Sequence, residues 1–128
     1  MKGLALVFLG AGLGGALRHA VNVGAARAFG AAFPWHTVAV NVVGSVAMGL
    51  LAGWLAVKAG KGWTEPVRLF VATGLLGGFT TFSAFSLDAV VLWQRGEAGA
   101  AAAYGLASVA LSIGGLLAGL FIVRVLTS

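Results

Sequence analysis

Residues 77–86 combine amino-acid types that a membrane-crossing helix ordinarily avoids. The run reads Gly-Gly-Phe-Thr-Thr-Phe-Ser-Ala-Phe-Ser, with apolar sequence on both sides. Glycine and threonine weaken a helix, and a backbone group freed from a helix inside the bilayer needs another partner. Broken helices near the bilayer midplane are places where transport proteins bind ions. The run therefore predicts a pathway for an ion or a small solute.

Polar side chains recur at helical spacing elsewhere in the apolar sequence. Asn41 and Ser45 are four residues apart and share a helix face. The Asn41 amide can donate two hydrogen bonds to a solute, or it can make a structural bond between helices. Tyr104, Ser108 and Ser112 follow one another at four-residue intervals. One such hydroxyl usually bonds its own backbone, whereas three on one face predict a polar track that lines a path.

Two aromatic residues and one arginine each allow a functional and a structural interpretation. Phe82 and Phe85 share a helix face, which is typical of core packing. Their ring edges carry positive partial charge and can also replace part of the hydration of an anion. Arg18 either snorkels to the membrane interface or draws anions toward a vestibule. His19, Ser83 and Asp88 have no spacing typical of a hydrolytic triad, so no enzyme is predicted.

The elements that must position these residues are four membrane spans. The chain has 128 residues, of which 60% are hydrophobic and 9% are charged, against about 25% charged in soluble domains. Crossing the hydrocarbon core takes about 20 residues. We therefore predict an all-α integral membrane protein that forms a single domain over residues 1–128. Its spans are expected at Leu4–Ala25, Thr37–Val57, Leu69–Trp93 and Ala100–Val123, the third one broken near the membrane centre.

Composition also bears on partners. The net charge of +5 is scattered without a basic run, which argues against a nucleic-acid partner. The 21 glycines concentrate in the spans, where small residues let helix backbones approach closely. That packing can lie within one subunit or between subunits. Four short helices leave little room for a pore inside one subunit, so a path at a dimer interface is favoured.

Three motifs resemble the Fluc (CrcB-type) family of fluoride channels. Residues 14–19 are similar to the family pattern Gly-Ala-x-x-Arg-Tyr, and residues 37–45 to Thr-x-x-x-Asn-x-x-Gly-Ser. Residues 77–86 are similar to Gly-Gly-x-Thr-Thr-Phe-Ser-Thr-Phe-Ser. The resemblance covers essentially the whole chain, and the third motif is very specific.

The resemblance implies an antiparallel homodimer in the lipid bilayer, with two fluoride pores along the interface. It implies a break of the third span at Gly77–Thr80, where backbone carbonyls of Gly77 and Thr80 bind one structural sodium ion on the dimer axis. Arg18 would belong to a vestibule. The implied pore residues are Asn41, Phe82, Ser83, Phe85, Tyr104, Ser108 and Ser112.

Four positions depart from the family pattern. Ala84 stands where a threonine is usual, and His19 where a tyrosine is usual. Asp88 replaces a glutamate, and Leu116 continues the polar track where another hydroxyl is expected. None of these changes removes a core element of the resemblance.

The function predicted from the sequence is passive, fluoride-selective export across the cytoplasmic membrane. One alternative is a small multidrug-type four-helix proton-coupled antiporter, which needs a membrane-embedded carboxylate, usually in the first span. The first span has none, and Asp88 is near a span end. A second alternative is a non-transporting assembly subunit, which would not need Asn41, the broken span and the hydroxyl track together.

Overall fold

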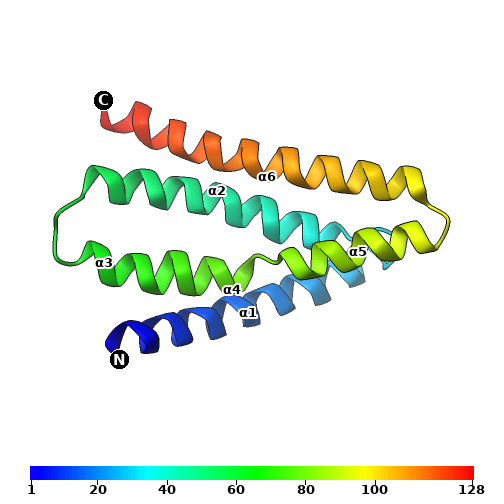
Figure 1. Cartoon of the computed structure of the whole chain (residues 1–128), viewed down its shortest axis with the longest axis horizontal. Helices are drawn as coiled ribbons and strands as arrows, with labels where there is room; N and C mark the ends of the chain where they lie inside the picture. The colour runs from blue at the N-terminus through cyan, green and yellow to red at the C-terminus, as the bar shows by residue number, and fades with distance from the viewer.

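The computed structural model describes residues 1–128 and contains only helices and short connections. Helix α1 spans Lys2–Phe29, α2 spans Trp35–Val57 and α6 spans Ala98–Thr127. A composite third rod lies between α2 and α6 in the chain, and its consecutive parts are α3 (Thr64–Val67), the π-helix η1 (Arg68–Leu76), α4 (Gly77–Phe79) and α5 (Phe82–Gln94). In Figure 1 the four rods run lengthwise, with both termini and the α2–α3 connection at one end.

The four predicted spans are confirmed. Four helical stretches, including the composite rod at Thr64–Gln94, are long and apolar enough to cross a membrane. Each helix extends beyond the predicted apolar core, because helical geometry continues through the polar residues that flank it. The third rod begins at Thr64 rather than Leu69, since Thr64 and Glu65 already form its first turn. The chain is therefore an all-α, multi-pass membrane protein.

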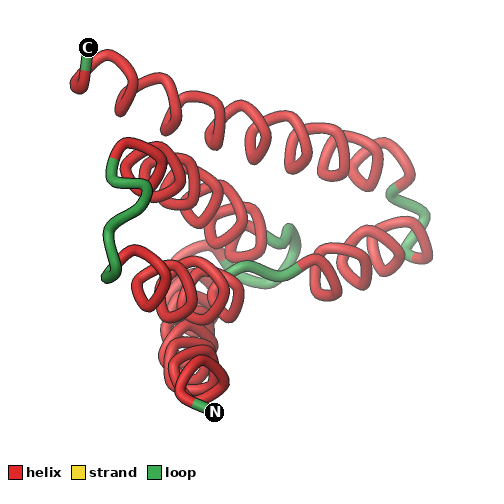
Figure 2. The backbone as a smooth tube through the Cα atoms, turned by 60° about the vertical axis from the view of Figure 1, so that its left-hand side comes forward, coloured by secondary structure: helices red, strands yellow, loops and turns green.

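The third span is broken, as predicted, and the break overlaps the end of the predicted segment Gly77–Thr80. Residues 77–79 are helical, and the backbone becomes extended at Thr80 (φ −80°, ψ 161°) and Thr81 (φ −154°, ψ 118°). Figure 2 shows the two halves of the rod joined there by a short loop. The helix resumes at Phe82. Within the predicted segment, Gly77 still has helical angles (φ −61°, ψ −39°), and Thr80 is the residue that leaves the helix.

Glycines bring the helices together in two pairs. An added Cβ at Gly74 would lie 3.0 Å from the Cα of Gly10, so α1 and η1 are in backbone contact. An added Cβ at Gly119 would lie 2.7 Å from the amide nitrogen of Leu50, so α6 rests on α2 in the same way. These glycines pack within one subunit. Others, such as Gly12 and Gly114, meet nothing within 4 Å.

Candidate functional site

Two side chains from other helices hold the break in the third span. The Asn41 amide nitrogen donates to the carbonyl oxygen of Thr81 at 3.0 Å, and its oxygen accepts from the Thr81 N–H at 2.7 Å. Arg18 Nη1 donates to the carbonyl oxygen of Thr80 at 3.1 Å. These bonds satisfy extended backbone that would otherwise be unpaired inside the bilayer. The position of the break is thus set by α1 and α2, and not by the glycines that precede it.

The threonines of the break complete its hydrogen bonding. Thr81 is the N-cap of α5, where its hydroxyl accepts from the Ala84 N–H at 3.1 Å. The Thr80 hydroxyl donates back to the Leu76 carbonyl at 2.9 Å and so covers the last turn before the break. A threonine N-cap contributes about 1 kcal/mol to helix stability. The two adjacent threonines therefore close one half-helix and start the next.

A cavity of about 280 Å³, here called the central cavity, lies beside the break. Helices α2, α5 and α6 supply most of its wall. Five of the seven pore residues expected from the sequence line it, namely Asn41, Phe82, Phe85, Ser108 and Ser112. Ser45, Thr80 and Thr81 also line it, together with Met48 and Leu116. The predicted polar and aromatic residues are therefore brought to one place.

The two phenylalanines differ in their surroundings. Phe82 is 77% exposed, whereas Phe85 is partly buried. Their ring centroids are 5.5 Å apart, and Phe85 lies 5.2 Å from the ring of Tyr104 on its other side. Phe85 is therefore held within an aromatic row, while Phe82 is exposed on the surface of the chain.

The hydroxyl track on α6 divides into two parts. Ser108 is buried, its hydroxyl oxygen has no hydrogen-bond partner, and it faces the central cavity with Ser112. Tyr104 is completely buried and is not part of the cavity wall. Its hydroxyl donates to Asp88 Oδ2 at 3.1 Å. Of the three residues of the track, Ser108 and Ser112 thus offer hydroxyls to a solute in this cavity.

Thr37 belongs to the site and was not among the predicted residues. Its hydroxyl donates to the same Asp88 oxygen, at 2.6 Å, and its side chain is buried. Asp88 is thus a paired carboxylate held by Thr37 and Tyr104. The signal that could have found Thr37 is its position, four residues before Asn41 on the same face of α2.

The remaining predicted residues lie near the break. Ser83 is exposed, does not line the central cavity, and has its hydroxyl 3.4 Å from that of Thr81. Gly77 is exposed, and its carbonyl lacks the usual helical donor because the Thr81 N–H bonds to Asn41 instead. The Thr80 carbonyl accepts from Arg18 and keeps a second lone pair. No group of three or more acidic, histidine or cysteine side chains is placed to hold a metal.

Comparisons with known proteins agree with this architecture. A protein-family model described as "CrcB-like protein, Camphor Resistance (CrcB)" matches residues 5–120. The chain is 57% identical over 122 residues to the "Fluoride-specific ion channel FluC" of Rhodopseudomonas palustris (strain BisB5), covering 95% of this chain and 97% of that protein. It is 58% identical over the same shares to "Fluoride-specific ion channel FluC 2" of Nitrobacter hamburgensis. The relative from Beijerinckia indica, also named FluC, is 50% identical over 99% of this chain and 100% of its own length. The predicted relationship is confirmed: the chain belongs to the CrcB-like protein family.

Proposed function

We propose that this chain is a fluoride-selective passive ion channel. The observation that carries the proposal is identity of 50–58% with proteins named fluoride-specific ion channels, over nearly the full length of both chains. A family of ion channels also excludes an enzymatic role. The central cavity, with its neutral donors beside a broken span, supports the same assignment.

The chemistry of the central cavity suits a small, strongly hydrated anion. Burying a carboxylate-sized ion already costs on the order of 20 kcal/mol in the idealised case, and fluoride is smaller. One N–H of the Asn41 amide bonds to Thr81 and the other remains for the cavity. The unpartnered Ser108 hydroxyl and the ring edges of Phe82 and Phe85 add further donors. Neutral donors replace hydration without the strong attraction that would prevent release.

The proposed pore is completed by a second copy of the chain. The central cavity is open, and Phe82 at its edge is 77% exposed. A groove that carries unpaired polar groups is unfavourable against lipid, so we expect protein to cover it. A two-fold axis in the membrane plane would give each subunit the same contacts and produce two equivalent pores. The two subunits of this homodimer would then be antiparallel.

A structural sodium ion on that axis is part of the proposal. Gly77 and Thr80 would hold it through backbone carbonyls, as half-helix ends do in other transport proteins. The Gly77 carbonyl without a helical donor fits this role, and the Thr80 carbonyl has one lone pair for it. Bound sodium would supply a fixed positive field near the anion path.

A proton-coupled antiporter is the less favoured function. Its mechanism needs an intramembrane carboxylate that binds and releases protons on the transport path. Helix α1 carries no carboxylate, and Asp88 is bonded to two hydroxyls outside the central cavity wall. A passive channel in the cytoplasmic membrane would instead let accumulated fluoride leave the cell.

Ion efflux from liposomes that contain only this protein tests the function. We expect rapid fluoride efflux and very slow chloride efflux when a potassium ionophore balances charge. Protein-free liposomes are the control. Equal flux of the two anions would contradict selectivity, and fluoride movement only under a proton gradient would support the antiporter instead.

A further inference from the structure

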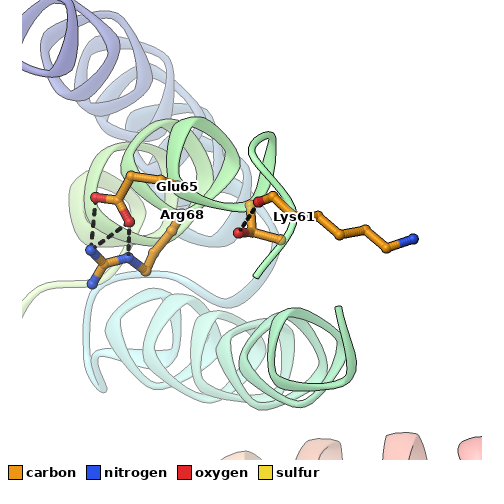
Figure 3. Close-up of polar contacts among 4 residues, drawn as sticks. Lys61, Glu65 and Arg68 are labelled. Carbon is orange, nitrogen blue, oxygen red and sulfur yellow. Dashed lines mark hydrogen bonds and ion pairs between the residues drawn. The ribbon is translucent and has the colours of Figure 1, made fainter. Parts of the chain in front are cut away.

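A second cavity lies between α2 and the first half of the third span. It has a volume of about 560 Å³ and is here called the outer cavity. Leu51 and Leu55 of α2 face Ala72 and Thr73 of η1 across it. Arg68 also lines it, and its Nε and Nη2 atoms donate to the Glu65 carboxylate at 2.7 to 3.0 Å. Figure 3 shows this ion pair at the α2–α3 end, with the Lys61 side chain directed away from it.

Met48 lines both the outer and the central cavity, and no other residue does. It belongs to one face of α2, on which Asn41, Ser45, Met48 and Ala52 follow at intervals of four, three and four. The face is polar up to Ser45 and apolar from Met48 onward. Met48 is therefore the point at which the donors on α2 end.

The donors on α6 end at the same level. Ser108 and Ser112 are followed one turn later by Leu116, which also lines the central cavity. An added Cβ at Gly49 would lie 3.1 Å from the Cα of Leu116, so the residue after Met48 is in backbone contact with Leu116. Met48 and Leu116 are thus two apolar residues on packed helices that line the central cavity where its donors end.

We propose that Met48, with Leu116 beside it, forms an apolar constriction that limits ion passage between the outer and the central cavity. The inference rests on the proposed channel function. An anion that leaves the serine and asparagine donors meets no replacement for its hydration at this level, and apolar constrictions control conduction by excluding water. The unbranched methionine side chain adopts several shapes, so it can open the constriction without moving a helix.

Substitution of Met48 tests the constriction by its size. We expect Met48→Ala to raise fluoride efflux several-fold and Met48→Phe to lower it several-fold. Val43→Ala is the matched control, because Val43 lies on the same helix, is 58% exposed and lines neither cavity. Efflux at the wild-type rate in both Met48 variants, beside a conducting wild type, overturns the inference. A wild type that conducts no fluoride overturns the proposed function itself.

A cysteine at position 48 can be modified after the protein has folded and been reconstituted, so a change in efflux on modification does not come from a folding defect. The chain has no cysteine of its own, so Met48→Cys can be labelled with a small methanethiosulfonate reagent after reconstitution. We expect mass spectrometry to show modification and fluoride efflux to fall several-fold in the same liposomes, while Val43→Cys keeps its rate. Modification without loss of flux, or failure of the reagent to reach the cysteine, overturns the constriction.

Discussion

Asn41 carries two roles that one side chain can combine. Its amide oxygen and one N–H bond the Thr81 backbone, and the second N–H remains for the central cavity. The sequence left a structural bond and a pore role as alternatives for this residue. The structural bond is present, and its geometry leaves the pore role available because the amide has two N–H groups.

Asn41→Asp should remove both contributions. A carboxylate accepts from the Thr81 N–H but cannot donate to the Thr81 carbonyl, so we expect a loss of about 1–3 kcal/mol in stability. A negative charge about 4 Å from the anion adds about 4 kcal/mol at the dielectric typical near a protein surface. If that repulsion falls fully on the barrier to passage, fluoride efflux should fall by about a thousandfold, measured with a fluoride electrode. Ser45→Ala, on the same face, is the control for a mild change, and normal flux in Asn41→Asp would remove Asn41 from the pore.

The two phenylalanines are tested by removing ring edges while keeping apolar bulk. We expect Phe82→Ile and Phe85→Ile to reduce fluoride efflux several-fold, because isoleucine has no positive ring edge. Phe85→Ile should also lower thermal stability, since Phe85 packs against Tyr104 at 5.2 Å. Phe121→Ile is the matched control, on a residue that is 65% exposed and lines none of the cavities described. Unchanged efflux in both variants would mean that the two rings only pack against their neighbours and do not contact the anion.

At the scale of elements, the spans could be predicted from apolar length, because a bilayer dictates that length. The break was predicted at Gly77–Thr80, and the structure places it at Thr80 and Thr81, at the end of that segment. Helix propensity alone indicates only that the helix is weak near the glycines and threonines. The carbonyls that leave the helix are those of Thr80 and Thr81, which accept from Arg18 and Asn41. Tyr104 was predicted on the polar track, and its role in the pore stays a prediction. Its spacing puts it on the hydroxyl face, but a carboxylate on another helix takes its hydroxyl.

Substitutions at Gly77 and Gly78 test two different contacts. Gly78 packs within one chain, whereas Gly77 would lie at the proposed two-fold axis. An added Cβ at Gly78 would lie 2.5 Å from the Ala11 carbonyl oxygen, whereas one at Gly77 meets its nearest atom at 3.7 Å. Gly78→Ala should therefore push α1 away from α4 and lower the unfolding temperature. Gly77→Ala should leave the protomer folded.

The same pair bears on the sodium proposal. If Gly77 carbonyls from two copies meet at one ion, Gly77→Ala should reduce the sodium-dependent part of the unfolding temperature, measured in sodium against potassium. Equal stability of the wild type in the two salts would contradict a bound sodium ion. Equal stability of Gly78→Ala and the wild type would contradict the close contact of α1 with α4.

At the scale of the whole molecule, charge is divided unequally between the two ends. One end carries Lys2, Lys58, Lys61, Arg68 and Arg124, and the other carries Arg27 and Arg95. Cytoplasmic ends are enriched in lysine and arginine, so this count favours one orientation. Arg68 is paired with Glu65 through its Nε and Nη2 atoms. An antiparallel homodimer would require insertion in both orientations, so the orientation has to be measured.

Cysteines placed at opposite ends measure that orientation directly. Ala59→Cys lies in the α2–α3 connection and Ala32→Cys in the α1–α2 connection, both at exposed positions of a cysteine-free chain. An impermeant thiol reagent applied to intact cells should label about half of each variant if both orientations insert equally, because each end then faces outward in one subunit of every dimer. Permeabilised cells, in which both variants should label fully, provide the control. Near-complete labelling of one variant and none of the other would establish a single orientation, and the central cavity would then have to be closed by a parallel copy or by a different chain.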